Sequence, residues 1–270
     1  MKIFNILTAS LASASRLQRA TREITYGFTG EESPEELTAI LDQITGGTFD
    51  EIDDMIRNLM GTSETRTSNP EEERKFRQMK ILVLWLQNSK KFGRYCFYGC
   101  YCLPEGSHNI AAGGYGKPQD SIDKACFDFK QCYRCLNAEF EEMKPHKTWA
   151  GGSVTKCAGE LLGYRFDLIG APEDPDRDIV CTNKPGSCRR SICECDKSLA
   201  KSLAKQEETW NPTLHELKGG FDRDQHCHRP TGPSVPFAEC CGDTFTFPFN
   251  KPRRENQCCS GTEALPEGTC

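Results

Sequence analysis

Cysteine content is the feature that most constrains how this chain can fold. The chain has 270 residues, of which 17 are cysteines, and its hydrophobic share is 37%. We expect such a chain to support a modest core with disulfides, which persist in oxidising compartments. Zinc sites favour repeated Cys-x-x-Cys or Cys/His pairs, and only Cys132 and Cys135 have that spacing. The cysteines therefore predict a secreted, disulfide-bonded protein, and their odd number leaves one sulfur free or bonded to another chain.

The N-terminus has the features of a secretion signal. Lys2 precedes an apolar run over residues 3–11, and Ala12-Ser13-Ala14 has the small residues of a cleavage site. We therefore predict a signal peptide over residues 1–14 and an extracellular location. No later apolar run approaches the roughly 18 residues that span a bilayer. A transmembrane segment is not predicted, and neither is a nucleic-acid partner.

Residues 15–75 are predicted to form an acidic helical extension. Ser33-Pro34-Glu35-Glu36 and Thr48-Phe49-Asp50-Glu51 both have the pattern of a capping box with an acidic first turn. A helical apolar pattern follows each of them, and Gly46-Gly47 separates the two, so we expect a helical hairpin. The extension either stays attached or is a propeptide that is cleaved after the dibasic pair Arg74-Lys75.

The two ends of the remaining chain differ in character. Residues 81–86 are apolar and predict either the core face of a helix or an interfacial surface. Residues 229–270 form a short tail that cannot bury much apolar surface and must depend on cross-links. The sequence leaves the pairing of its cysteines open; these are Cys240, Cys241, Cys258, Cys259 and Cys270.

Three motifs lie in order between these ends. They are the segment 98–102 followed by the glycine-rich segment 113–120, the segment 123–133, and the cysteine-rich segment 181–196. Together they resemble the secreted phospholipase A2 family, including its otoconin-like relatives, over residues 76–228. The resemblance implies a mainly α, disulfide-rich fold with two long antiparallel helices. It also implies a small β-wing near Tyr164 to Cys181.

The resemblance also implies a set of disulfides. The pairs carried over from the family are Cys102–Cys126, Cys132–Cys195, Cys181–Cys193, Cys157–Cys188 and Cys100–Cys227. A further family bridge is absent because its two positions are Ala125 and Ser202. Cys96 and Cys135 are additional to the family pattern, and we predict that they pair with each other.

The resemblance implies a hydrolysis reaction, but the two side chains on which that reaction depends are replaced in this sequence. In the family a histidine is the general base for hydrolysis of a phospholipid ester, and calcium is held by loop carbonyls and a helix aspartate. Phe129 stands at the place of the histidine, and a phenyl ring cannot accept a proton. Lys130 stands at the place of the aspartate, and its ammonium repels calcium. We therefore expect the chain not to be an enzyme, and to have no metal or cofactor beyond weak calcium binding at its surface.

Groups that support the family's histidine are retained. Asp196 matches the aspartate that orients it, and Tyr133 and Tyr164 match its tyrosine partners. Asp196 is expected either to pair with Lys130 or to accept hydrogen bonds from the two tyrosines. Remnants of the calcium loop are Tyr101, Gly113, Gly114 and Gly116. The five histidines are expected at the surface; they are His108, His146, His215, His226 and His228.

Three functions are compatible with these features. The first is a secreted, non-catalytic protein of extracellular matrix or of a calcium carbonate biomineral, because acidic stretches suit calcium-rich surfaces. The second is binding to, or perturbation of, a phospholipid membrane, although the acidic net charge of -5 disfavours anionic membranes. The third is calcium-dependent phospholipase A2 with residual activity.

Overall fold

The computed structural model describes residues 24–47, 70–102, 113–140, 144–228, 239–246, 251–253 and 256–270. The described chain is helical and disulfide-rich, with eight disulfides. None of its described helices is both long enough and apolar enough to span a membrane.

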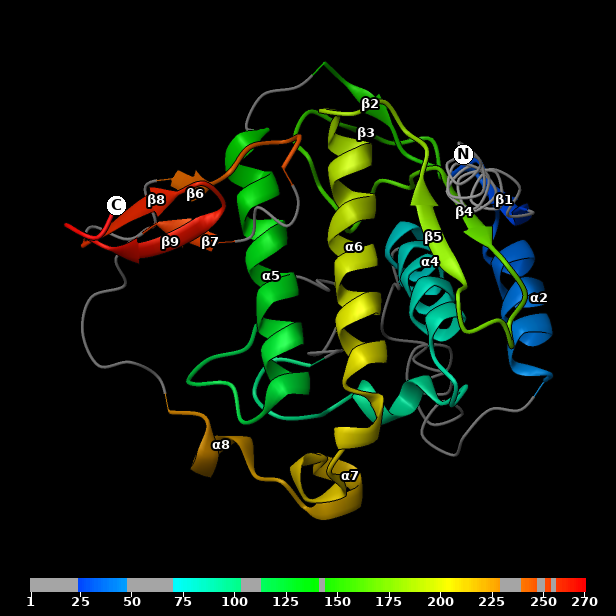
Figure 1. Ribbon diagram of the computed structural model, residues 1–270. Helices are drawn as coiled ribbons and strands as arrows, with labels where there is room; N and C mark the ends of the chain where they lie inside the picture. The colour runs from blue at the N-terminus through cyan, green and yellow to red at the C-terminus, as the bar shows by residue number, and fades with distance from the viewer. Residues whose placement is uncertain are drawn as a thin grey trace, which may run out of the picture.

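Two long helices, α5 (Ser121–Glu139) and α6 (Cys188–Lys205), lie side by side and run in opposite directions (Figure 1). The Cys132–Cys195 disulfide joins their middles. Each begins at a side chain that accepts a backbone N–H of its first turn, Asp120 for α5 and Ser187 for α6. This pair of helices forms the layer that carries the candidate site.

Helix α4 (Pro70–Leu86) packs against α6 on one side and against α2 (Pro34–Thr45) on the other. The predicted capping box at the start of α2 is confirmed, because Ser33 and Glu36 each accept the other's backbone N–H. The apolar segment 81–86 is buried except for Leu86, which is half-buried, so its prediction as a helix-core face is confirmed. The second helix predicted for the extension falls on residues 48–60, outside the described residues.

A three-stranded antiparallel sheet joins the N-terminal region to the rest of the protein. Its order is β1 (Ile24–Phe28), β4 (Phe166–Ile169), β5 (Asp178–Cys181). Phe28 pairs with Phe166 across β1 and β4, and their rings stack with centroids 4.1 Å apart. Residues that we assigned to a separate extension therefore form part of the same sheet and core as the later chain.

The dibasic pair Arg74-Lys75 lies inside α4, so the boundary drawn at residue 75 falls within a helix. Both side chains are buried, and Arg74 donates to the carbonyl of Gly30 at 3.0 Å. A protease does not reach a peptide bond that is both helical and buried. In this fold, cleavage after Lys75 would first require α4 to unwind.

The remaining elements are short. They are η2 (Phe92–Tyr95), β2 (His146–Lys147), β3 (Ser153–Val154), η3 (Glu207–Thr209), η4 (Pro212–Leu214), α7 (Glu216–Gly219) and α8 (Arg223–His226). In the tail, β6 (Glu239–Cys241) pairs with β7 (Lys251–Arg253), and β8 (Gln257–Ser260) pairs with β9 (Glu263–Pro266). The two hairpins lie beside α5 (Figure 1).

The structure contains all five disulfides that the resemblance implied. The predicted Cys96–Cys135 bridge is wrong, because Cys135 is bonded to Cys240. The physical reason is that β6 and β7 pack against α5 and bring Cys240 to it, whereas Cys96 lies buried at the end of η2. The other tail cysteines pair as Cys241–Cys259 and Cys258–Cys270.

Candidate functional site

The residues that replace the family's catalytic pair lie on the inner face of α5. Phe129 is 2% exposed and its ring packs on that of Tyr133, with centroids 4.7 Å apart. Lys130 is 1% exposed. At position 129, where the resemblance implies a general base, the structure therefore has a buried hydrocarbon ring, which neither takes nor gives a proton.

Asp196, on α6, is the centre of a buried polar cluster. Its Oδ1 accepts from the Tyr133 hydroxyl at 2.6 Å and its Oδ2 from the Tyr164 hydroxyl at 2.5 Å. The cation in contact with its carboxylate is the ammonium of Lys75, from α4. The structure thus brings Asp196, Tyr133 and Tyr164 together, which is the second of the two alternatives expected for Asp196, and it adds an ion pair with Lys75.

Sequence reasoning missed Lys75 for an identifiable reason. Lys75 and Asp196 are 121 residues apart, and the dibasic sequence drew attention to cleavage rather than to burial. One signal was available: the position falls among apolar residues at helical spacing, so a helix through residue 75 turns it toward the core.

Burial dominates the electrostatics of this cluster. Both charged side chains, Lys75 and Asp196, are 0% exposed. Burial lowers the pKa of Lys75, and the negative charge of Asp196 opposes that change. Burial, reinforced by the charge of Asp196, raises the pKa of both Tyr133 and Tyr164. The ammonium also lies over the Tyr164 ring, 4.7 Å from its centroid, so the cluster encloses the cation on several sides.

The calcium-loop remnant keeps its tight backbone. The Tyr101 hydroxyl donates to the carbonyl of Gly116 at 2.6 Å. Gly113, Gly114 and Gly116 all have positive φ, and a side chain at Gly114 would collide with the Tyr101 ring. The intervening residues 103–112 lie outside the described part of the chain.

Asp123 fixes the start of this loop. Its buried carboxylate accepts backbone N–H groups from Cys100 at 2.8 Å, Tyr101 at 2.7 Å and Gln119 at 2.9 Å. Through these three hydrogen bonds the carboxylate holds the backbone of the loop in place. Across the described ranges, no three His, Cys, Asp or Glu side chains are grouped so that they could hold a metal ion.

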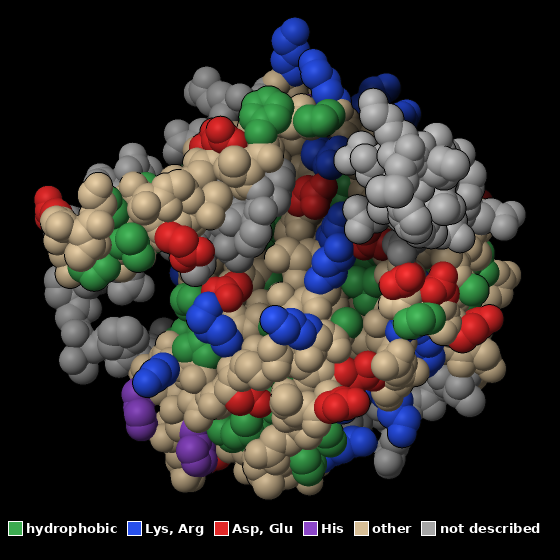
Figure 2. Space-filling model, viewed as in Figure 1, with side chains coloured by type: hydrophobic (Ala, Val, Ile, Leu, Met, Phe, Trp, Pro, Cys, Tyr) green, Lys and Arg blue, Asp and Glu red, His purple; other side chains and the backbone are tan. Residues whose placement is uncertain are grey.

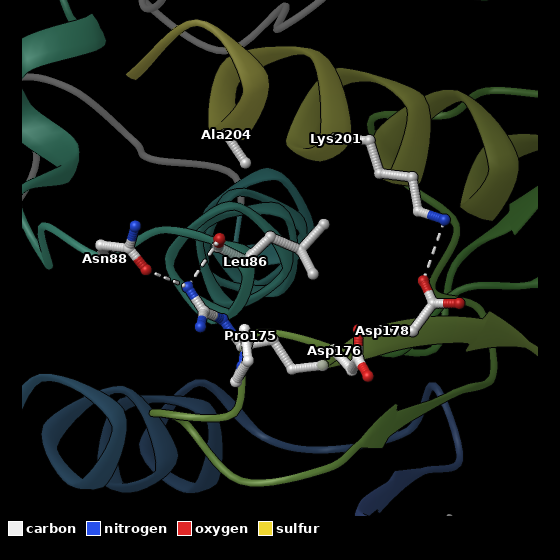
Figure 3. A pocket seen from close by; sticks show the side chains of 8 residues that line it. Leu86, Asn88, Pro175, Asp176, Asp178, Lys201 and Ala204 are labelled. Carbon is white, nitrogen blue, oxygen red and sulfur yellow. Dashed lines mark hydrogen bonds and ion pairs between the residues drawn. The ribbon is translucent and has the colours of Figure 1, made fainter. Parts of the chain in front are cut away.

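A cleft of about 470 Å³ lies between the C-terminal end of α4, the 175–178 turn and α6 (Figure 3). Arg177 forms part of its wall and donates to the carbonyls of Trp85 at 2.6 Å and Leu86 at 2.8 Å, which closes the end of α4. On the opposite wall, Lys201 Nζ lies 2.9 Å from Asp178 Oδ1. The cleft therefore carries charges of both signs beside the apolar side chains of Leu86 and Ala204.

The solvent face of α6 carries a row of cations, which we call the α6 basic face: Arg190, Lys197, Lys201 and Lys205. Their spacing of seven, four and four residues places them on one side of the helix. Figure 2 shows Lys and Arg side chains over the part of the surface where α6 runs. Arg190 pairs with Glu194 and Lys201 with Asp178, and among the described residues no ion pair involves Lys197 or Lys205.

The histidines of the described residues differ in their burial. His215 was expected at the surface but is buried, where its Nδ1 accepts the backbone N–H groups of Leu217 and Lys218. It therefore caps α7 from its N-cap position. His226 is exposed, as expected, and His108 lies outside the described residues.

Comparison with known proteins finds similarity to named phospholipases A2 over about half of this chain. No family model matches it. Phospholipase A2 EC1 of Echis coloratus is 27% identical over 172 residues, covering 57% of this chain and 97% of that protein. The basic phospholipase A2 beta-bungarotoxin A1 chain of Bungarus candidus is 30% identical over 129 residues, covering 48% of this chain and 73% of that protein. The membrane-associated phospholipase A2 of Mus musculus is 27% identical over 117 residues, covering 43% of this chain and 60% of that protein.

These matches correct the prediction that the chain is not an enzyme. The similar proteins are named as phospholipases A2, so the comparison points to a family of enzymes. Phe129 and Lys130 alter the chemistry at two positions, and they do not by themselves establish inactivity. With 30% identity over 73% of a named relative, and with the shared disulfides, the chain belongs to the phospholipase A2 family.

Proposed function

We propose that this protein is an extracellular member of its family that binds phospholipid surfaces. The observation that carries the proposal is the α6 basic face, a row of four cations on one side of a helix, of which Lys201 and Lys205 are exposed and Arg190 and Lys197 are half-buried. Negatively charged headgroups attract such a row, and the relatives named as phospholipases A2 act on phospholipid. The net charge of -5 belongs to the whole chain and does not describe this face.

The apolar face of α4 is not available for the same purpose. Leu82, Val83 and Trp85 are all fully buried, because α2 and the strand β1 cover this helix. Membrane contact through α4 would require these covering elements to move away. Electrostatic contact through α6 requires no rearrangement.

The expected affinity is modest. Each Lys or Arg near an anionic surface contributes about 1 kcal/mol. Glu194 and Asp178 offset two of the four cations, which leaves Lys197 and Lys205 and roughly 2 kcal/mol of electrostatic attraction. Binding at this level depends on ionic strength, because exposed charges are screened by salt.

An otoconin-like role in a calcium mineral or matrix remains a prediction from the sequence. Its acidic residues within the described ranges do not converge on a metal site. We therefore place phospholipid binding first.

Vesicle co-sedimentation tests the proposal. The full chain is incubated with phosphatidylserine-containing or pure phosphatidylcholine vesicles at millimolar calcium, and pelleted protein and released fatty acid are measured in the same tubes. We expect pelleting with the anionic vesicles at low salt and its loss at high salt. Absence of pelleting with either vesicle would overturn the proposal. Fatty-acid release above a blank would show that the activity named for the relatives is retained.

A matched pair of variants distinguishes an effect of the α6 basic face on vesicle binding from an effect of the protein's net charge. Lys197→Gln/Lys205→Gln removes two cations from α6 and should weaken binding about thirtyfold, equivalent to about 2 kcal/mol. Lys117→Gln/Lys124→Gln removes the same charge from exposed lysines on other elements and should have little effect. Equal loss in both variants would contradict a role for α6.

A further inference from the structure

We propose that Lys75 and Asp196 form an intramolecular isopeptide bond, which would join α4 covalently to α6. The two side chains are in direct contact, and neither is exposed to solvent. They come from different helices, 121 residues apart in the chain. This modification site is separate from the proposed lipid-binding face and does not depend on it.

The geometry around Asp196 suits attack on its carboxyl carbon. Lys75 Nζ contacts the carboxyl group, and each carboxyl oxygen accepts a hydroxyl, from Tyr133 at 2.6 Å and from Tyr164 at 2.5 Å. Two fixed donors at the carboxyl oxygens withdraw charge from the carbon, and they stabilise the oxyanion of a tetrahedral intermediate. Both reacting side chains are 0% exposed, which keeps bulk water away from the reacting atoms, and water would otherwise hydrolyse the product.

Burial also favours the reactive form of the amine. Amide formation needs the neutral amine as its nucleophile, and a dry environment disfavours the charged ammonium. Burial lowers the pKa of Lys75 in this cluster. The contact therefore places an amine that burial drives toward its neutral form directly against the carboxyl group of Asp196.

Glu160 is a further carboxyl that interacts electrostatically with both Lys75 and Asp196. Burial raises the pKa of its carboxyl, and the charges of Lys75 and Asp196 both act on it. The preceding residue, Gly159, lies against the Tyr133 ring so closely that a side chain there would collide with it. In the proposed reaction its protonated carboxyl donates to the departing oxygen and then accepts a proton from nitrogen.

The reaction balances without any oxidant or co-reactant. A bond forms between Lys75 Nζ and Asp196 Cγ, and one Cγ–Oδ bond breaks. The departing oxygen leaves as water with two of the three ammonium protons, and the third stays on the amide nitrogen. Fixed contact of this kind corresponds to effective concentrations on the order of 10⁵ M or more, which favours condensation that free groups in water do not undergo.

Mass spectrometry of the folded wild-type chain tests the bond directly. The purified protein is fully reduced, alkylated and digested with trypsin, so that disulfides cannot link the peptides. We expect a branched peptide that joins the segments containing Lys75 and Asp196, with a mass one water below the sum of the two. Quantitative recovery of the two linear peptides from folded protein would overturn the proposal and leave an ion pair only.

Two variants test the assigned roles. Lys75→Arg keeps the positive charge but lacks the amine, so the branched peptide should disappear. Since that variant risks misfolding in a fully buried site, Glu160→Gln provides the second test: the fold should be kept, judged by near-ultraviolet circular dichroism, while the branched fraction falls at least tenfold. An unchanged branched fraction in folded Glu160→Gln would remove Glu160 from the reaction.

Discussion

Leu37 provides the sharpest test of whether the N-terminal region is an integral part of the fold. Its side chain is 0% exposed on α2, which packs along α4. Leu37→Ala removes three carbon atoms, worth about 0.8 kcal/mol each, or about 2.4 kcal/mol in all. The cavity left behind adds to this loss, and we expect a total decrease of about 3 kcal/mol in the free energy of unfolding.

Leu217 supplies the control, because the same substitution there removes the same atoms from a side chain that is 47% exposed. We expect Leu217→Ala to change the free energy of unfolding by about 0.5 kcal/mol or less. The comparison cancels the effects of the substitution on the unfolded chain to a first approximation.

The measurement is urea unfolding followed by circular dichroism, with disulfides intact, together with amide hydrogen exchange of α2. Faster exchange in α2 should accompany the loss of stability in Leu37→Ala. Equal unfolding midpoints for the two variants would refute the reasoning. They would show that α2 opens independently of the helices it covers.

Three further outcomes are expected. Replacing both Cys135 and Cys240 by serine should speed amide exchange in β6 and β7, because that bridge joins the tail to α5, and should weaken the tail's attachment by about 2–4 kcal/mol; unchanged exchange would mean that packing alone holds the tail. Ser33→Ala should cost about 1 kcal/mol in urea unfolding by removing the cap of α2, and a neutral result would count against the capping box. Partial burial acts to raise the pKa of Asp178, but the hydrogen bond from Lys201 and a backbone N–H outweigh it, so the pKa lies below 3.8. The resulting stabilisation is present above pH 3.8 and is lost as pH falls through the lowered pKa; Asp178→Asn should therefore flatten the acid limb of a plot of unfolding midpoint against pH.

Local signals in the sequence predicted much of the fold. The capping box at Ser33 was readable because its residues lie three positions apart. The resemblance supplied the pairings of Cys132 and Cys181, since the family spacing survives. Contacts between segments that are distant in the chain could not be predicted from the sequence, because no periodic pattern or motif links such segments. The pairing of β1 with β4 is of this kind, as is the bridge from Cys135 to the tail.

In the candidate site, too, some contacts follow from a sequence pattern and others join distant segments that no pattern links. The hydrogen bonds of Tyr133 and Tyr164 to Asp196 follow from the family pattern. Lys75 does not, because it lies just before residues 76–228, the range that resembles the family, and its apolar surroundings indicate burial without indicating a partner. Burial of a charge is decided by what packs around it, and that is known only once α4 is placed against α6.

The vicinal cysteines of the tail determine how the protein responds to a proteolytic nick. Cys240 is bonded to α5, Cys241 to Cys259, and Cys258 to Cys270. A single cut on either side of the Cys240–Cys241 peptide bond, anywhere from residue 229 onward, leaves both fragments attached through sulfur. Cleavage of that one bond releases residues 241–270 as a separate cross-linked piece. The integrity of the C-terminal end therefore depends on one amide, and denaturing gels run without reductant would not reveal a nick at any other place within residues 229–270.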